Sequence, residues 1–253
     1  YNLFFILYMA DVYTNPELYD AIHHEFQWDK KLIQSIAKNI DGPVLELASG
    51  TGRLTQSILE LGLDYTGLEL SQSYLERAKT KYGNRANFIL GDMRNFDFRN
   101  EFDFIFIGFN SFLHNLTLKD AEDCLSCVKK HLSNTGDFLL SIFVPDPTFL
   151  YREKNKLFPT AWDFFQYKQS RCRIMEKNQY DSESQINQIT WIIERDGKLD
   201  FEEYQYSMRM YYPHEMDILL SENGFIIREK FGDYDGTLMT DESHMQIYVC
   251  ESS

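Results

Sequence analysis

The sequence predicts an α/β protein with a doubly wound, mostly parallel sheet of seven strands and an inserted antiparallel β lid. Short apolar runs typical of buried parallel strands alternate along the chain with helical patterns. The first strand, with Val44 and Leu47, passes through the glycine turn 49–52 into a helical pattern that starts at Leu54. In sheets of this kind ligands bind beyond the carboxyl ends of the strands. We therefore expect functional residues in the loops that follow the strands.

The elements of the main sheet follow from this alternation. Asn15 and Pro16 begin two amphipathic helices that end near residue 40, and Ser71 is the expected N-cap of a later helix. The predicted strands are mostly apolar, and they span 43–47, 64–70, 87–90, 102–107, 138–144, 224–230 and 246–251. Helices are expected over 118–132 and 213–223.

Residues 148–212 have a different pattern, rich in aromatic residues and glutamine, with alternation of period two. Strands are expected at 171–175, 186–193 and 204–211, and 195–197 is a hairpin turn signal between the last two. The predicted organisation is an N-terminal extension over 1–14, a cofactor-binding domain over 15–147 and 213–253, and an inserted lid over 148–212.

Composition limits the classes of partner. The formal net charge of -14 disfavours nucleic acid as a partner. Four unevenly spaced cysteines indicate a reducing cytoplasm, and Cys124 and Cys127 lie in a helical pattern where packing is expected instead of a metal site. We expect no metal, no membrane partner, and a monomer or homodimer.

The first ten residues are strongly apolar but shorter than the roughly 20 residues that a membrane-spanning helix needs. They lack the basic region of a signal peptide. Two interpretations remain open. Either the chain starts biologically at Met9 and carries an extension, or an ordered N-terminal segment packs on the core.

The residues around the glycine turn narrow the class of ligand. A dinucleotide fingerprint requires a third glycine where this chain has Thr55, and Glu46 on the strand suits a positively charged ligand better than a pyrophosphate. Glu69, at the end of the second strand, can accept both hydroxyls of a ribose. Asp92 can accept from an adenine amino group while Met93 lies along the ring.

The chain resembles the class I S-adenosylmethionine-dependent methyltransferases in three motifs. These are E-L-A-S-G-T-G at 46–52, E-L-S at 69–71 and G-D-M at 91–93. The resemblance implies S-adenosyl-L-methionine as the cofactor. It also implies contacts from the following residues: Glu46, Ala48, Gly50 and Gly52 to the amino-acid part, Glu69 to the ribose, and Asp92 with Met93 to the adenine, with Leu70 and Phe109 in the same cofactor site.

A narrower similarity is to bacterial sugar N-methyltransferases, which also place a β-rich lid after the fifth strand. It is carried by E-L-Y-D at 17–20, G-D-M-R-N-F at 91–96 and F-N-S-F-L-H at 109–114. This similarity implies catalytic roles for Tyr13 and His114.

The residues by themselves leave some roles open. His114 follows the fourth strand and can act as a general base, or it can simply pack that short segment. Tyr19 can hydrogen-bond the cofactor carboxylate or belong to the core. The lid aromatics can line an acceptor pocket or fill a core of their own, and they are Trp162, Phe164, Phe165, Tyr167 and Trp191.

The function predicted from these observations is methyl transfer to the nitrogen or oxygen of a small molecule, such as an amino sugar. The alternatives are a non-catalytic interaction protein of the same fold and, disfavoured by Glu46 and Thr55, an NAD-dependent oxidoreductase. Methylation of nucleic-acid bases is disfavoured because the fourth strand runs into G-F-N-S at 108–111 in place of an N/D-P-P-Y/F loop.

Overall fold

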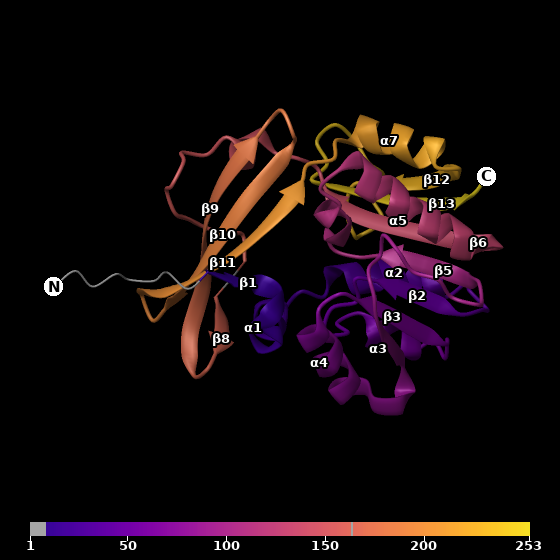
Figure 1. Cartoon of the computed structure of the whole chain (residues 1–253), viewed down its shortest axis with the longest axis horizontal. Coiled ribbons are helices and arrows are strands. Elements are labelled where there is room, and N and C mark those ends of the chain that lie inside the picture. The colour runs from indigo at the N-terminus through magenta and orange to yellow at the C-terminus, as the bar shows by residue number, and fades with distance from the viewer. Residues whose placement is uncertain (1–8, 163) are drawn as a thin grey trace.

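The computed structural model describes residues 9–162 and 164–253, which form two sheets lying side by side (Figure 1). Residues 1–8, which belong to the apolar start with two open interpretations, lie outside the described residues. The larger sheet is on the right of Figure 1 and the smaller sheet is on the left.

The larger sheet has seven strands in the order β12-β13-β6-β5-β2-β3-β4. Their bounds are β2 Val44–Leu47, β3 Tyr65–Glu69, β4 Asn87–Leu90, β5 Phe102–Ile107, β6 Leu132–Phe143, β12 Phe225–Phe231 and β13 Met245–Ser252. All neighbours from β6 to β4 are parallel, and β13 is antiparallel to β6 and β12. The predicted doubly wound, mostly parallel sheet of seven strands is therefore confirmed.

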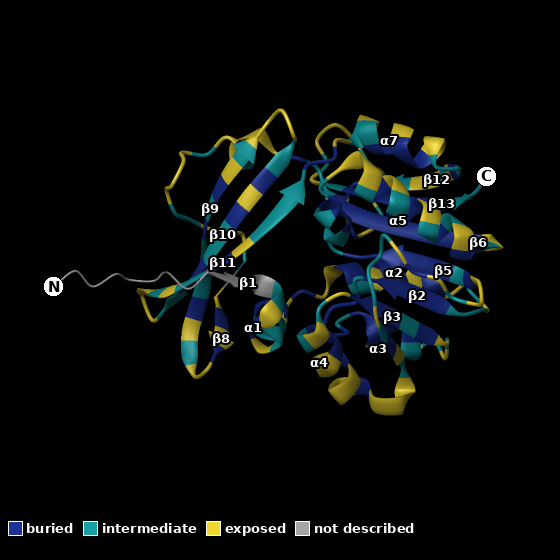
Figure 2. Cartoon of the chain, in the orientation of Figure 1, coloured by how far each residue is buried: buried dark blue, intermediate teal, exposed yellow. Residues whose placement is uncertain are grey.

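Helices cover both faces of this sheet because successive side chains of a strand point to opposite faces. In β5, Phe104 and Phe106 pack in one apolar cluster, whereas Ile105 and Ile107 pack in another. The helices on the Phe104 side are α2 Trp28–Ala37, α3 Thr55–Leu59 and α4 Gln72–Tyr82, and those on the Ile105 side are α5 Leu118–His131 and α7 Pro213–Glu222. The central strands are accordingly buried along most of their length (Figure 2).

The start of α5 shows how local sequence sets an element. Thr117 and Asp120 form a capping box, in which Asp120 N donates to Thr117 Oγ1 at 3.0 Å and Thr117 N donates to Asp120 Oδ2 at 3.1 Å. Cys124, on the apolar face of α5, is fully buried in the core, and Cys127 is partly buried. The cysteine pair therefore packs, as expected.

The smaller sheet has the order β1-β11-β10-β9-β7, with β8 also paired to β9. Its strands are β1 Met9–Asp11, β7 Phe158–Pro159, β8 Phe165–Tyr167, β9 Ser170–Asp181, β10 Ile186–Arg195 and β11 Lys198–Arg209. The turn between β10 and β11 consists of Asp196 (φ 46°) and Gly197 (φ 82°), as the hairpin signal predicted. The polypeptide passes from β6 of the larger sheet into this sheet through α6 Pro147–Leu150.

The N-terminal segment contributes a strand that the sequence did not indicate. Residues 9–11, part of the predicted extension, form β1, which is parallel to β11 with Met9 opposite Glu203. The short 3-10 helix η1 (Val12–Thr14) then leads into α1 (Pro16–Ile22). Asn15 caps α1 by accepting from Leu18 N at 3.1 Å, at the predicted start.

Helix α1 packs against the smaller sheet. Leu18 and Ile22 form an apolar cluster with residues of β8, β9, β10 and β11, namely Phe165, Tyr167, Cys172, Ile174, Ile193 and Tyr204. Phe165 and Tyr167, left open between an acceptor pocket and a core, are therefore core residues. No helix in the described part of the chain is long and apolar enough to cross a membrane.

A buried ion pair joins α2 to the loops that follow β2 and β5. Arg53 Nη1 lies 2.8 Å from Asp29 Oδ1 and Arg53 Nη2 lies 2.5 Å from Asp29 Oδ2. The Arg53 guanidinium also lies 4.8 Å from the centre of the Phe26 ring and 5.6 Å from that of Phe109. The Asp29 side chain is 0% exposed, so loss of either partner would leave a buried charge uncompensated.

We predict that Asp29→Ala lowers the free energy of unfolding by about 3–5 kcal/mol, because it strands the Arg53 charge in the interior. Urea unfolding followed by circular dichroism measures this change. Asp123→Ala is the matched control, since it removes the exposed Lys119–Asp123 pair of α5 and should cost less than about 1 kcal/mol. Equal effects of the two substitutions would contradict the assignment.

Candidate functional site

The glycine turn after β2 has a backbone that favours glycine. Gly50 and Gly52 have φ values of 59° and 77°, in the left-handed region, and Ala48 also has a positive φ of 56°. A Cβ on Gly52 would lie 2.7 Å from the Tyr82 ring, whose hydroxyl donates to Gly52 O at 2.7 Å. Residue 52 must therefore be small so that α4 can pack against the turn.

Glu69, at the carboxyl end of β3, is held by backbone donors on both sides. Its Oε2 accepts from Gly50 N and its Oε1 accepts from Ser71 N, each at 2.7 Å. Burial raises the pKa of Glu69, and the hydrogen bonds from Ser71 and Gly50 oppose that shift. The carboxylate is thus fixed between the glycine turn and the start of α4.

Asp92 follows β4 and is paired with a cation. Arg94 Nη2 lies 2.6 Å from Asp92 Oδ2, and Arg94 Nη1 lies 3.0 Å from Asp120 Oδ1. Hydrogen bonds from Arg94 lower the pKa of Asp92, so its carboxylate is ionised and can accept hydrogen bonds at neutral pH.

The loop after β5 carries two strained residues, Phe109 (φ 45°) and Asn110 (φ 65°). Both are held against β6: Phe109 N donates to Ser141 Oγ at 3.0 Å, and Asn110 N donates to Ser141 O at 3.0 Å. Asn110 Oδ1 in turn accepts from Phe143 N at 2.8 Å. These bonds fix the start of the 3-10 helix η3 (Ser111–His114).

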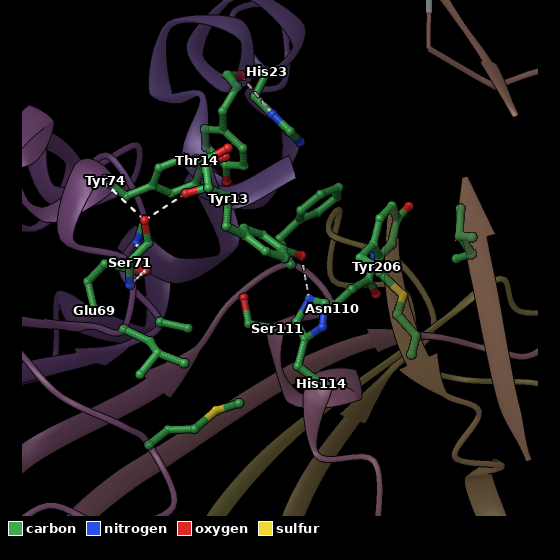
Figure 3. A pocket seen from close by; sticks show the side chains of 18 of the residues that line it. Tyr13, Thr14, His23, Glu69, Ser71, Tyr74, Asn110, Ser111, His114 and Tyr206 are labelled. Atoms are coloured by element: carbon green, nitrogen blue, oxygen red, sulfur yellow. Dashed lines mark hydrogen bonds between the residues drawn. The ribbon is translucent and has the colours of Figure 1, made fainter. Parts of the chain in front are cut away.

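His114 and Tyr13 form a hydrogen-bonded pair although they are far apart in sequence. Tyr13 Oη lies 2.5 Å from His114 Nε2, and His114 Nδ1 lies 3.1 Å from the carbonyl oxygen of Ser207 (Figure 3). Because a carbonyl can only accept, Nδ1 carries the proton, and in the neutral ring Nε2 accepts from the Tyr13 hydroxyl. The pair connects the N-terminal segment to the loop after β5.

Tyr13 is also tied to α4. Its carbonyl oxygen accepts from Ser71 Oγ at 2.7 Å and from Ser73 Oγ at 3.1 Å. Tyr19, on α1, stacks on His23 at a centroid distance of 4.1 Å. Burial raises the pKa of Tyr19 and lowers that of His23 to about 3, so both rings are neutral at physiological pH.

One cavity of about 760 Å³ collects these groups between the two sheets. Such a volume is in the range of cavities that hold a cofactor and a small substrate. The predicted site residues that line it are Tyr13, Tyr19, Ala48, Gly50, Glu69, Leu70, Asp92, Met93, Phe109 and His114. Residues that the prediction did not include also line it, among them His23 on the α1 side, Phe143 at the end of β6, Phe149 in α6, and Glu176, Ile189, Tyr206 and Met208 on the smaller sheet.

Two of the predicted site residues do not line this cavity. Gly52 lies behind the turn against Tyr82. Glu46 is 4% exposed on β2, and Tyr65 Oη donates to its Oε2 at 2.5 Å. Of the lid aromatics, Trp162 and Trp191 line the cavity, whereas Phe164 is 47% exposed and lies outside it.

Sequence reasoning missed the residues from the smaller sheet for a physical reason. Glu176, Tyr206 and Met208 reach the cavity only because β9 and β11 present one face to the larger sheet. The period-two alternation was visible, but nothing in it indicates which of the two faces points to the site.

Comparison with known proteins identifies the class. Residues 44–136 match a family model described as a methyltransferase domain. YqeM of Bacillus subtilis (strain 168), which is named as a methyltransferase, is 23% identical over 238 residues, covering 90% of each chain.

Solved structures share the fold. The CcbJ methyltransferase from Streptomyces caelestis superposes with a TM-score of 0.79 at 20% identity, covering 96% of this chain and 98% of that one. CalS10, an amino pentose methyltransferase from Micromonospora echinaspora solved with S-adenosylmethionine bound, gives a TM-score of 0.68 at 15% identity, covering 93% and 97%.

Residues 44–136 therefore form a methyltransferase domain, and the chain has the fold of the solved methyltransferases, as the sequence motifs implied. S-adenosylmethionine, the cofactor that the sequence motifs imply, is bound in the CalS10 structure. The family model covers β2 through the first part of β6, which contains the glycine turn, Glu69, Asp92 and His114.

The buried Glu46 carboxyl leads to a prediction about how the free energy of unfolding depends on pH. Burial raises its pKa from 4.5 to about 8 in the folded protein. Between these values the unfolded chain has released a proton that the folded protein still holds, so the free energy of unfolding falls as pH rises, by at most about 1.4 kcal/mol per pH unit. Glu46→Gln should lack this contribution.

Urea unfolding of both proteins at pH 5.5 and pH 7.5 measures the difference. Relative to the wild type, Glu46→Gln should gain stability at the higher pH. Glu242→Gln, at an exposed position, should show the pH dependence of the wild type. A stability difference between the wild type and Glu46→Gln that is independent of pH would contradict the prediction.

Proposed function

We propose that this methyltransferase acts on a small-molecule acceptor that binds between the larger sheet and the smaller sheet. The observation that supports this most directly is the shared cavity. Strand-end residues of the larger sheet line one part, the smaller sheet lines another, and the Tyr13–His114 pair belongs to the same wall. In this proposal residues 148–212 are a lid that holds the acceptor.

The residues beyond the strand ends fit the cofactor. A Cβ added at Gly50 would lie 3.7 Å from the Tyr19 hydroxyl oxygen. The absence of a side chain at Gly50 therefore leaves that part of the cavity open. We assign the cofactor's ribose to Glu69, its adenine to Asp92 with Met93, Leu70 and Phe109, and its amino-acid part to Ala48, Gly50 and Tyr19. When bound, the cofactor supplies a methyl group already activated by a sulfonium.

Glu46 and Gly52 support this site indirectly in the proposal, because neither lines the cavity. Glu46 fixes the strand before the turn through its bond with Tyr65, and Gly52 allows α4 to approach. Their substitution should change cofactor affinity through the shape of the turn.

His114 is the group best suited to remove a proton from the acceptor. In the neutral form of the ring Nε2 is an acceptor, and the bond from Nδ1 to Ser207 O fixes the ring orientation. Tyr13, which donates to the same nitrogen, orients the ring further and must give way or pass on its proton when an acceptor binds. Walls on two sides of the cavity would align the acceptor with the cofactor.

The acceptor class is proposed from the wall of the smaller sheet and from similarity. Trp162, Trp191 and Tyr206 offer flat aromatic surfaces, which suit the apolar faces of a sugar or a small ring. The motifs shared with sugar N-methyltransferases and the likeness to an amino pentose methyltransferase support an amino sugar as one candidate. We also propose a cytoplasmic location, supported by the four free cysteines, and a monomer or homodimer.

The cofactor assignment predicts that Glu69→Gln weakens binding of S-adenosylhomocysteine by about ten- to hundred-fold, because a charge-assisted hydrogen bond contributes about 1.5–3 kcal/mol. Isothermal titration calorimetry measures the affinity. The control is Glu60→Gln, an exposed position next to α3. NAD should not bind to either protein, and unchanged affinity in Glu69→Gln would refute the assignment.

The base assignment predicts that His114→Ala lowers methyl transfer by about 10²–10⁴-fold while affinity for S-adenosylhomocysteine stays within a factor of two. Transfer from methyl-labelled S-adenosylmethionine to a panel of amino sugars measures the rate. Tyr13→Phe keeps the ring but removes the hydroxyl, and it should shift the pH profile of transfer. Equal rates for His114→Ala and wild type at every pH would rule out the base role.

A further inference from the structure

One charged group in the cavity has no role in the proposed reaction. Glu176 lies on β9, its side chain is 9% exposed, and it lines the cavity that contains Tyr13 and His114. It is the only charged residue that the smaller sheet contributes to the described lining. A carboxylate in such a position is costly to bury unless it binds something.

Two donors already fix the Glu176 carboxylate. Trp191 Nε1 donates to Oε2 at 2.9 Å, and Arg152 Nη1 donates to Oε1 at 2.9 Å. An ionised carboxylate has about four acceptor positions, so capacity remains for a donor in the cavity. Arg152 does not line the cavity, and its guanidinium stacks on Phe149 at 4.7 Å and Phe158 at 5.1 Å.

Aromatic rings extend from Glu176 to the reaction centre. The Trp191 and Tyr206 ring centroids are 5.1 Å apart, and those of Tyr206 and His114 are 6.3 Å apart. The Tyr206 phenol is close enough to Glu176 that, after burial, the carboxylate charge is the largest cause of its raised pKa. Glu176 and His114 are therefore separated by two rings along one wall.

This combination favours a cation over a neutral hydroxyl. A carboxylate attracts an ammonium directly, and the faces of tryptophan and tyrosine attract cations through their quadrupoles. Among the Asp, Glu, Lys and Arg residues of the described lining, which are Glu69, Asp92, Arg94 and Glu176, three of the four are acids. The formal net charge of -14 also favours the approach of a cation.

We infer that Glu176 binds an ammonium group of the methyl acceptor, at a point separated by the Trp191 and Tyr206 rings from the atom that is methylated beside His114. The acceptor then has two polar ends, a nucleophile and a charged amine, and belongs to the diamines or amino alcohols. This inference rests on the proposed function only for the end of the acceptor that is methylated beside His114. The ammonium site at Glu176 does not depend on that function.

A pair of simple probes tests the site by binding. Benzylamine is an ammonium at pH 7, and benzyl alcohol is a neutral molecule of similar shape. Titration followed by tryptophan fluorescence should give at least about ten-fold tighter binding of benzylamine to the wild type. Glu176→Gln keeps the shape of the side chain and one acceptor oxygen, for either Trp191 or Arg152, but loses the charge, and it should abolish this preference.

Two further variants make the test specific. Glu194→Gln removes the carboxylate of another ion pair on the same sheet, in which Arg173 Nε lies 2.9 Å from Glu194 Oε1. Glu194 does not line the cavity. This variant should keep the preference of the wild type. Arg152→Met removes the cation that competes for Glu176 and should increase the preference, which provides a second readout if Glu176→Gln fails to fold.

Equal affinity of the wild type for both probes, absence of benzylamine binding up to tens of millimolar, or a preference that persists in Glu176→Gln would overturn the inference. The titrations are run with and without S-adenosylhomocysteine, whose own binding is measured by calorimetry. If S-adenosylhomocysteine does not bind while the preference depends on Glu176, the cofactor assignment fails and the ammonium site stands. If it binds and the preference is absent, only the ammonium site fails.

Discussion

The buried Arg53–Asp29 pair is the interaction on which the geometry of the site depends most. Arg53 ends the glycine motif, Asp29 belongs to α2, and the guanidinium lies between the Phe26 and Phe109 rings. One side chain therefore sets the position of the glycine turn relative to the loop after β5. Those two loops line the cavity on the side of the larger sheet, so the pair acts on the site without lining it.

The smaller sheet turns the edge at which the parallel strands end into a cavity with walls from both sheets. The larger sheet supplies acids and backbone donors at the ends of its strands. The smaller sheet supplies mainly aromatic and aliphatic side chains, and Glu176 is the one carboxylate that it adds to the described lining. Under the proposed function this division is physically sensible, because a charged and heterogeneous cofactor would need fixed hydrogen-bond partners, while a small acceptor would gain most from desolvation. Tyr13 and His114 come from loops at the boundary between these two kinds of wall.

How much the sequence predicted depended on how local each signal was. The strands of the larger sheet, the Thr117 helix start and the Asp196-Gly197 turn were predictable because neighbouring residues determine them. The position of Glu69 and Asp92 in the cavity wall was predictable because parallel strands end at one edge of the sheet. Glu46 was misplaced relative to the cavity because alternation along β2 turns its side chain toward Tyr65. The pairing of β1 with β11 and the role of the β9 face depend on contacts between distant segments, which no local pattern specifies.

The N-terminal segment has a mechanical consequence for ligand exchange. Residues 9–13 join β1 in the smaller sheet to the Tyr13 carbonyl, which Ser71 and Ser73 hold at the start of α4. This segment is a covalent crossing between the sheets in addition to those that enter and leave the 148–212 insertion. The smaller sheet therefore cannot swing away as a simple hinged flap. If the smaller sheet moves away and takes Tyr13 with it, the bonds of Tyr13 to Ser71, Ser73 and His114 must break, so the exchange of both ligands then depends on the same few hydrogen bonds.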